Sequence, residues 1–264
     1  MEIIIESMDF GYKDVEVLHD INLKLDKPGL VCVVGPNGVG KSTLVCCINK
    51  LHSPKSGRIL IDGIDLREIS IKELSKVVGY VPVSSQDLFS MTVFDTVMMG
   101  RHPHQQLGRT SELDRKIVKR SMSMLGIKHL ALRNFSDLSA GQHQKVAIAR
   151  GLAQTPRLLI LDEPTSNLDV RHQIQVTERL RDLAIQNGMI ILMISHDLNI
   201  SAKFADEIVM MASPGVIYGV GSPCDIITEK SIREVYGVEC HVIDDMGRPH
   251  VILEKALDDD AGTW

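Results

Sequence analysis

The sequence feature that most constrains the fold of this chain is the stretch GPNGVGKST, which runs from Gly35 to Thr43. It follows a continuous apolar run, Leu30 to Val34, and it precedes a helical pattern. The stretch matches G-x-x-x-x-G-K-[ST], in which a glycine-rich turn between a buried strand and a helix closes backbone N–H groups around phosphates. The sequence therefore predicts an α/β fold with a phosphate site at the end of one buried strand.

Two side chains of this loop are expected to contact the nucleotide and its metal ion. Lys41 is expected to reach the β- and γ-phosphates as a point charge, and the Ser42 hydroxyl to ligate Mg²⁺. The positive end of the following helix also favours an anion at this point. The predicted nucleotide-binding residues of the loop are Gly35, Pro36, Asn37, Gly38, Val39, Gly40, Lys41, Ser42 and Thr43.

Three further apolar runs, at residues 77–81, 158–161 and 189–194, are continuous rather than alternating. Continuous runs are typical of strands buried on both faces of a parallel sheet. They are followed by the polar clusters PVSSQ, DEPTSNLD and SHD. Because ligands gather at the carboxyl ends of such strands, we expect these clusters and the phosphate loop to form one site.

The cluster after residue 161 begins with two acids, Asp162 and Glu163. Asp162 is expected to hold the Mg²⁺ shell, and Glu163 to polarise the attacking water as a general base. An ordinary solvated acidic pair is the alternative, and the phosphate loop elsewhere in the chain disfavours it. After the next run, His196 is placed to donate a hydrogen bond to a γ-phosphate. A hydrolase triad is rejected for Ser195–His196–Asp197, because triads are defined by geometry and not by adjacency in sequence.

The chain has 264 residues, near the upper limit for one hydrophobic core. We predict a single domain whose core comprises residues 1–86 and 151–264. Within it, short strands at Ile3–Glu6, Ile21–Leu25 and Ile59–Asp62 predict a small antiparallel β subdomain. Residues 87–150 are predicted to form an inserted helical subdomain that ends in the LSAGQ stretch discussed below. In it, Ser111 and Asp114 resemble a capping box, helical spacing follows, and Gly126 is a plausible stop.

Charge and hydropathy exclude several classes of protein. With 29 basic and 34 acidic residues the chain carries a net charge of −5. It therefore lacks the excess of Lys and Arg that is typical of nucleic-acid-binding proteins. No apolar run approaches the roughly 20 residues that cross a bilayer, and the acidic start does not resemble a signal peptide. We therefore expect a protein made in the cytosol that reaches a membrane only through a partner. The five cysteines form no C-x-x-C pair and are expected to be reduced, buried thiols.

A second stretch suited to an anion, LSAGQHQ, runs from Leu138 to Gln144. The phosphate loop, LSAGQ, LDEP, SNLD and SHD stand in the order seen in ATP-binding-cassette ATPases, and the chain resembles that family from residue 1 to about 255. The resemblance implies ATP and Mg²⁺ as cofactors, and two copies paired head to tail. Ser139, Gly141 and Gln142 would then contact the ATP held by the partner's phosphate loop. The stretch Asn167–Leu168–Asp169 resembles the D-loop that crosses the same interface, and Tyr12 the aromatic that stacks on adenine, with an ordinary surface tyrosine as the alternative.

In one place the chain departs from the family pattern. The family usually has Gln directly after the strand, as in V-P-Q, whereas this chain has Val83 there and Gln86 three residues later. Either Val83 occupies the glutamine position, or Gln86 reaches the Mg²⁺ by another loop path. Gln86 is kept as the candidate metal residue.

The stretch FDTVMMGRHPH, from Phe94 to His104, resembles the V-x-D-x-V-x-M-G-R-x-P-H stretch of importers for iron–siderophores, haem and cobalamin. Later segments resemble the same subfamily: GVGSP, VYGV and GRPH. The resemblance implies a peripheral ATPase on the cytoplasmic face of the membrane, with a dimeric permease and, indirectly, an extracytoplasmic binding protein. His102 and His104 are readable as loop residues, as a metal pair or as part of the permease interface.

Alternative functions within the family remain open. A zinc or manganese importer ATPase is the nearest of them. A soluble scaffold ATPase of iron–sulfur cluster assembly is disfavoured by the permease-like loop. A chromosome or repair ATPase would need a long coiled coil, and no heptad run exists.

Overall fold

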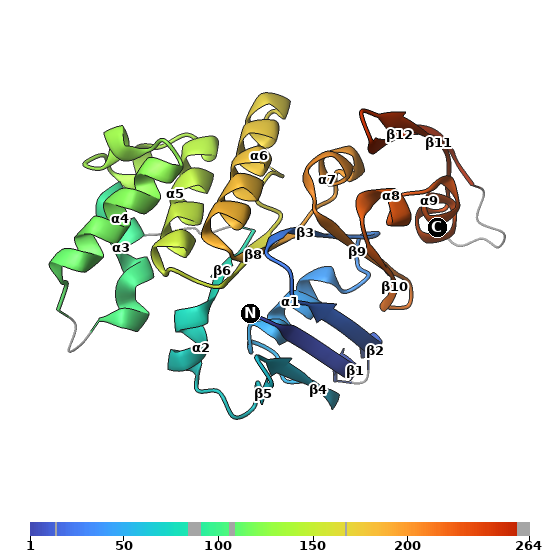
Figure 1. Ribbon diagram of the computed structural model, residues 1–264, viewed down its shortest axis with the longest axis horizontal. Helices are drawn as coiled ribbons and strands as arrows, with labels where there is room; N and C mark the ends of the chain where they lie inside the picture. The colour runs from blue at the N-terminus through green and yellow to red at the C-terminus, as the bar shows by residue number, and fades with distance from the viewer. Residues whose placement is uncertain (14, 84–90, 106–108, 167, 258–264) are drawn as a thin grey trace.

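The computed structural model describes residues 1–13, 15–83, 91–105, 109–166 and 168–257 (Figure 1). At its centre lies a six-stranded sheet with the order β10-β9-β3-β8-β7-β6. The pairs that join β9, β3, β8, β7 and β6 are all parallel, and β10 pairs antiparallel with β9 at one edge. The strands of this sheet are β3 (Gly29–Val34), β6 (Val78–Val81), β7 (Leu158–Asp162), β8 (Ile190–Ile194), β9 (Glu207–Ala212) and β10 (Val216–Gly221).

The four apolar runs of the sequence became β3, β6, β7 and β8, so the prediction of a parallel core is confirmed. Every residue of β3, β7 and β8 is buried. Alternate residues of β3 enter two different cores: Leu30, Cys32 and Val34 enter one, and Val31 and Val33 the other. The sheet therefore separates two hydrophobic layers, as a strand buried on both faces requires.

The second sheet is antiparallel and has the order β2-β1-β4-β5. Its strands are β1 (Ile3–Tyr12), β2 (Val15–Leu25), β4 (Ser56–Ile61) and β5 (Ile64–Asp65). The predicted antiparallel subdomain is thus present, but the prediction of short first strands was wrong. β1 continues to Tyr12 because it pairs with β2 on one side and β4 on the other, with bulges at which the register shifts.

Helices cover both faces of the central sheet. On the face of the antiparallel subdomain, α1 (Lys41–Ile48) contributes to the same core as that subdomain. Along the other face lie α5, α6 and α7 (Figure 1), whose buried side chains share the larger core. The other helices outside the segment between β6 and β7 are α2 (Ile71–Val77), α6 (Val170–Asn187), α7 (Leu198–Phe204), α8 (Pro223–Ile226) and α9 (Glu229–Tyr236).

Between β6 and β7 the described chain consists of helical segments, which gather at one end of the molecule (Figure 1). They are α3 (Val93–Met98), η1 (Met99–His104), α4 (Glu112–Met124), η2 (Lys128–Leu130), η3 (Phe135–Asp137) and α5 (Ala140–Ala153). The expected capping box is formed: Ser111 Oγ accepts from the Asp114 amide at 3.1 Å, and Asp114 accepts in return from the Ser111 amide at 2.9 Å. Gly126 stands just beyond α4 with a φ of +68°.

At the other end a two-stranded hairpin, β11 (Val238–Asp245) and β12 (Arg248–Ala256), follows α9 (Figure 1). No pattern in the sequence predicted this hairpin or strand β9. The cysteines form no disulfide. The expectation that all of them are buried was wrong for Cys224, which is exposed, and for Cys46, which is half-buried. In the part of the chain that the structure describes, no helix is long and apolar enough to span a membrane.

Candidate active site

The phosphate loop joins β3 to α1 and turns tightly at two glycines. A Cβ at Gly35 would lie 2.4 Å from the carbonyl oxygen of Met211, and one at Gly40 would lie 2.7 Å from Leu18 Cδ2. Both glycines also have positive φ, +151° and +100°, so any side chain there would be excluded by space as well as by backbone conformation. α1 starts directly after Gly40 with no side-chain cap, so the amides of its first turn face the loop.

Lys41 is only 5% exposed, although it is charged. Its Nζ donates to the carbonyl oxygens of Gly35 at 2.7 Å and of Pro36 at 2.8 Å, which keeps the ammonium group folded over the loop. Burial lowers the pKa of Lys41, and the nearby carboxylates of Glu163 and Asp162 oppose that shift. The ammonium is therefore held where a phosphate chain in the loop would meet it.

Asp162, the last residue of β7, is also 5% exposed. Ser42 Oγ donates to Asp162 Oδ1 at 3.2 Å, so a hydroxyl and a carboxylate converge beside the loop. Burial raises the pKa of Asp162, the Ser42 bond lowers it, and the neighbouring Glu163 charge raises it again. Two oxygen donors of this kind suit Mg²⁺, which prefers carboxylate and hydroxyl ligands and keeps several waters. Ser42 and Asp162 thus fit the expected metal.

Tyr80, on β6, was not foreseen as part of this site. Its hydroxyl hydrogen-bonds to Asp162 and to Cys46. Burial, followed by the charge of Asp162, raises the pKa of Tyr80, so the phenol stays protonated and can donate to the carboxylate. In the sequence Tyr80 lies within an apolar run, where nothing distinguishes it from a core aromatic.

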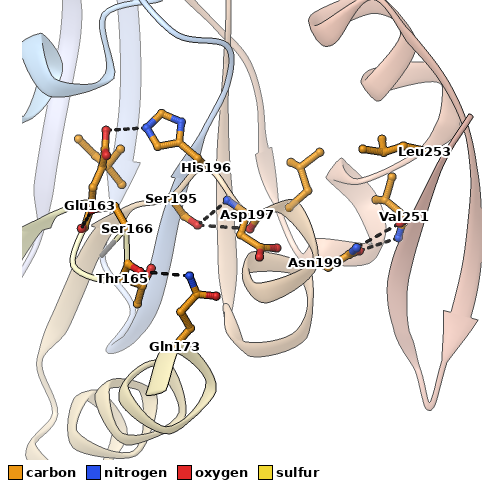
Figure 2. Close-up of a pocket in the computed structure, with 12 residues that line it drawn as sticks. Glu163, Thr165, Ser166, Gln173, Ser195, His196, Asp197, Asn199, Val251 and Leu253 are labelled. Carbon is orange, nitrogen blue, oxygen red and sulfur yellow. Dashed lines mark hydrogen bonds and ion pairs between the residues drawn. The ribbon is translucent and has the colours of Figure 1, made fainter. Parts of the chain in front are cut away.

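Glu163 and His196 are brought together from the ends of two strands (Figure 2). His196 Nε2 lies 2.5 Å from Glu163 Oε1. Because an ionised carboxylate only accepts, the ring N–H is the donor. Glu163 has a φ of +48°, a left-handed conformation that is rare for a residue with a side chain. The chain turns sharply there, so the carboxylate leaves the axis of β7 and faces the histidine.

A cavity opens beside this pair. Figure 2 shows Gln173 of α6 donating to the Thr165 carbonyl, at 3.1 Å, along one wall. On the opposite wall Asn199, Val251 and Leu253 complete the cavity. The last two belong to β12, some fifty residues beyond the SHD cluster in sequence, and no motif in the sequence pointed to them.

The LSAGQ stretch forms the start of α5. Ser139 is the N-cap of that helix: its Oγ accepts from the Gln142 amide at 3.4 Å, and Gln142 Oε1 accepts from the Ser139 amide at 3.1 Å. A Cβ at Gly141 would stand 3.4 Å from Leu168 Cδ2, so this helix start lies against the LD of SNLD. Asp169 caps α6 and bonds to the ring of His172, with Nδ1 2.8 Å from Oδ1.

Ser139, Gly141, Gln142, Leu168 and Asp169 line one pocket together. Within the described part of the chain, the cavity beside Glu163 and His196 shares no lining residue with this pocket. Among the described residues, none of the phosphate loop lines the LSAGQ pocket, so the two places suited to an anion are not joined in one pocket of the single chain.

Tyr12 lies at the end of β1, where the hairpin turns into β2. It is 49% exposed; its hydroxyl and His52 Nε2 are 2.8 Å apart, and its ring meets Phe10 edge-on. β2 also supplies Leu18, which packs over Gly40, so this hairpin flanks the phosphate loop. Tyr12 is thus an exposed aromatic on an element that borders the loop.

Two of the expected residues, Gln86 and Asn167, lie outside the described residues. Val83 lies just beyond β6 and is 39% exposed. His104 Nε2 bonds to the Gln154 carbonyl at 2.8 Å, which uses one ring nitrogen for a structural contact. Among the described residues no cluster of three or more His, Cys, Asp or Glu side chains could hold a metal, so His102 and His104 do not form one.

Comparison with known proteins gives a consistent result. The sequence profile of the ABC transporter family matches residues 18–166, which include the loop, the LSAGQ stretch and the Asp162–Glu163 pair. An uncharacterised ABC transporter ATP-binding protein of Methanocaldococcus jannaschii is 38% identical over 96% of this chain and 98% of its own length. The ferric enterobactin transport ATP-binding protein of Escherichia coli K12 is 34% identical over 94% of this chain and 92% of its own.

Among solved structures, one chain of a metal-chelate type ABC transporter in an inward-facing conformation superposes with a TM-score of 0.83. It is 27% identical, and the match covers 96% of this chain and 97% of the other. The similarity therefore extends beyond the phosphate loop to the inserted helices and to most of the carboxyl-terminal segment.

Proposed function

This chain belongs to the ABC transporter family and is an ATP-hydrolysing subunit; from that premise we propose that it powers an importer of iron–siderophore, haem or cobalamin type cargo. In this proposal two copies bind the cytoplasmic face of a dimeric membrane permease, which receives cargo from an extracytoplasmic binding protein. The observation that carries it is the convergence of Lys41, Asp162, Glu163 and His196 on one end of the parallel sheet.

For hydrolysis we assign Glu163 as the general base. A water that attacks the γ-phosphorus gives its proton to the Glu163 carboxylate as the bond to the leaving ADP breaks. His196 donates from Nε2 to the Glu163 carboxylate, 2.5 Å away, and in this proposal the same N–H turns to the γ-phosphate once ATP is bound. Lys41 compensates charge on the phosphates. Ser42 and Asp162 would hold Mg²⁺, which would supply further charge neutralisation there, and Gln86 remains the candidate link to it.

We propose that the LSAGQ pocket serves the ATP of a second copy. Among the described residues the LSAGQ pocket includes none of the phosphate loop, and this supports the assignment. Ser139, Gly141 and Gln142 would then cap the γ-phosphate, with Asp169 beside them. Closure that exists only with the γ-phosphate present reverses on hydrolysis. To shift the equilibrium between open and closed copies from 1:99 to 99:1, ATP must bind the closed state more tightly by about 5.5 kcal/mol.

The helical segment 87–150, proposed as a subdomain between the two parts of the core, offers a rigid path toward the permease. A Cβ at Gly100 would lie 2.1 Å from the Arg150 carbonyl oxygen, so the MGRHPH turn is pressed against α5. Arg101 donates from Nη1 to the Ala153 carbonyl at 2.8 Å and from Nε to Asp114 at 2.8 Å, both in a buried setting. Because α5 starts at the LSAGQ pocket and ends at these contacts, a push on the turn would move that pocket.

The proposed class of cargo is inferred from the similarity of this chain to known proteins. The Escherichia coli relative transports ferric enterobactin by its name, and the matching solved transporter is of metal-chelate type. The FDTVMMGRHPH stretch lies on α3 and η1, where Met98, Met99 and His102 line a surface pocket suited to an apolar partner element. Together these observations support a chelate importer over a soluble scaffold ATPase.

Uptake by whole cells tests this function. Cells that lack the chain should lose uptake of a labelled ferric siderophore, haem or cobalamin, and the wild-type chain should restore it while Glu163→Gln should not. Labelled zinc and manganese serve as the competing cargoes. Loss of zinc or manganese uptake alone would move the chain to the rival importer class, and undisturbed uptake of all five would favour a role outside transport.

A further inference from the structure

Helix α7 begins at Leu198, and only Asp197 separates it from His196. The position of α7 therefore sets the position of His196. Asp197 is the N-cap: its Oδ1 accepts from the Ile200 amide at 2.9 Å, and its carbonyl accepts from Ser201 Oγ at 2.8 Å. These bonds tie the SHD turn to the helix. A shift of α7 would therefore be passed to the His196 backbone.

The carboxyl-terminal hairpin forms hydrogen bonds with α7 near both ends of the helix. Near the start, Asn199 Nδ2 donates to the Val251 carbonyl at 3.1 Å, and the Val251 amide donates to Asn199 Oδ1 at 2.7 Å (Figure 2). Near the end, Arg248 donates to the carbonyl of Ala205, the C-cap of α7, at 2.7 Å. The side-chain amide of Asn199 thus pairs with the N–H and the carbonyl of Val251, as the backbone of a neighbouring strand would.

The hairpin is itself fixed to the body of the protein. Val251 and Cys240 are buried in the larger core together with Ile232 of α9 and Ile200 of α7. An isolated two-stranded hairpin is only marginally stable in water, so the contacts with α7 and α9 stabilise it. The hairpin can therefore serve as a fixed point against which α7 is held.

The same carboxyl-terminal segment also reaches the phosphate loop. Tyr236, the last residue of α9, lies beside the backbone of Gly35: burial raises the pKa of its phenol, and the Gly35 backbone partly offsets that rise. The segment thus contacts the catalytic site at two points, the start of the phosphate loop and the helix that follows His196. Position errors of about 1 Å in a catalytic group can lower rates by roughly 10²-fold, so such contacts bear on turnover.

We propose that Asn199 is a positioning residue for ATP hydrolysis: by fastening the first turn of α7 to Val251, it holds His196 in line with Glu163. The inference rests on the roles proposed above for Glu163 and His196. Asn199 touches neither of them and acts only through the SHD turn. The β11–β12 hairpin, which no motif marked as part of the site, becomes its outer support.

The test compares Asn199→Ala with Asn187→Ala. Asn187 also donates from Nδ2 to a backbone carbonyl, that of Leu183 at 2.8 Å, but at the far end of α6. We expect Asn199→Ala to lower kcat for ATP about tenfold with KM unchanged, since the phosphate loop is intact. Asn187→Ala should leave kcat as it is. Unchanged kcat in Asn199→Ala, or an equal loss in both variants, would overturn the inference.

A double-mutant cycle with His196→Ala separates positioning from general weakening. If Asn199 acts through His196, adding Asn199→Ala to His196→Ala should cause no further loss of kcat in single-turnover assays. Losses that multiply would contradict the inference and leave the proposed function standing. A normal rate in His196→Ala alone would instead contradict the catalytic assignment itself.

Should Asn199→Ala not fold, Asn199→Asp keeps the measurement open. It is nearly isosteric and retains the acceptor for the Val251 amide, while the Val251 carbonyl loses its donor. A loss of kcat is expected in Asn199→Asp, and it should again be absent in the His196→Ala background. Full activity of folded Asn199→Asp would contradict a role for the donor half of the contact.

Discussion

His196 Nε2 and Glu163 Oε1 lie 2.5 Å apart, although the two residues follow different strands and are 33 positions apart in sequence. β7 and β8 are parallel neighbours, paired from Leu158 with Ile190 to Asp162 with Ile194. The next residues along each strand therefore emerge at the same sheet edge. The pair is a direct product of strand register.

Glu163→Gln should reduce ATP hydrolysis by roughly 10²-fold or more, because an amide cannot accept the proton of the attacking water. ATP affinity should be retained, since Lys41 and the loop are untouched. Phosphate release and calorimetric nucleotide binding measure the two quantities. Glu178→Gln, an exposed position on α6, is the matched control and should behave as wild type. Near-normal turnover in Glu163→Gln would remove Glu163 as the base.

Ser139→Arg should abolish ATP-driven pairing of two copies while single-chain ATP affinity stays within about twofold, because in the proposed arrangement the LSAGQ pocket contacts only the partner's nucleotide. Ser139→Ala controls for the lost helix cap, which costs about 1 kcal/mol of stability. Light scattering and calorimetry on both variants separate pairing from binding. An equal loss of both properties in Ser139→Arg would place this pocket at the chain's own nucleotide.

The buried Arg101–Asp114 pair should make the helical segment sensitive to acid. Burial alone would raise the pKa of Asp114, but bonds from Arg101 and Ser111 outweigh it and bring the pKa to about 2, against 3.8 for an ordinary aspartate. Because the folded-state pKa is the lower one, the stabilisation is complete above pH 3.8 and is lost as pH falls through about 2. Urea unfolding at pH 7 and at pH 3 measures this loss.

Removing one partner of the same pair tests the physical cause. Asp114→Asn leaves a buried guanidinium without its counter-charge, which typically costs about 3–5 kcal/mol. Arg101→Met combined with Asp114→Leu should be less harmful than Asp114→Asn alone, and its stability should lose the acid dependence assigned to Asp114. An acid dependence that survives in the double variant would mean that another carboxyl is responsible.

Gln86→Ala should lower ATPase activity several-fold if Gln86 fills the glutamine role of the family. Val83→Ala should then have little effect, because the Val83 side chain is 39% exposed at the end of β6. Steady-state ATPase assays at varied Mg²⁺ concentration compare the two variants. If Val83→Gln raises activity and Gln86→Ala is silent, the role belongs to position 83.

Much of the catalytic end was predictable because it depends on short local patterns. Apolar runs fixed β3, β7 and β8, and the polar residues after them had to meet at one edge. Asp162, Glu163 and His196 were found in this way. Tyr80 was not, because within an apolar run a tyrosine that donates to Asp162 looks the same as one that packs.

The carboxyl-terminal support could not be predicted for a different reason. The contact between Asn199 and Val251 spans 52 residues of sequence, and it depends on how the hairpin docks against α7. β1 was predicted too short because its part beyond Glu6 is held by pairing with β2 and, at Asp9, with β4, and that part carries the polar residues Ser7 and Asp9. Tertiary pairing overrode local composition there.

In the proposed cycle the LSAGQ pocket of one copy completes the nucleotide site of another. Sedimentation of purified Glu163→Gln with and without Mg-ATP tests it most directly, because this variant should bind ATP without consuming it. The account predicts a monomer without nucleotide and a dimer with Mg-ATP, and no dimer when Ser139→Arg is added. A sedimentation coefficient that does not change with Mg-ATP at high protein concentration, also in the presence of the permease, would contradict it.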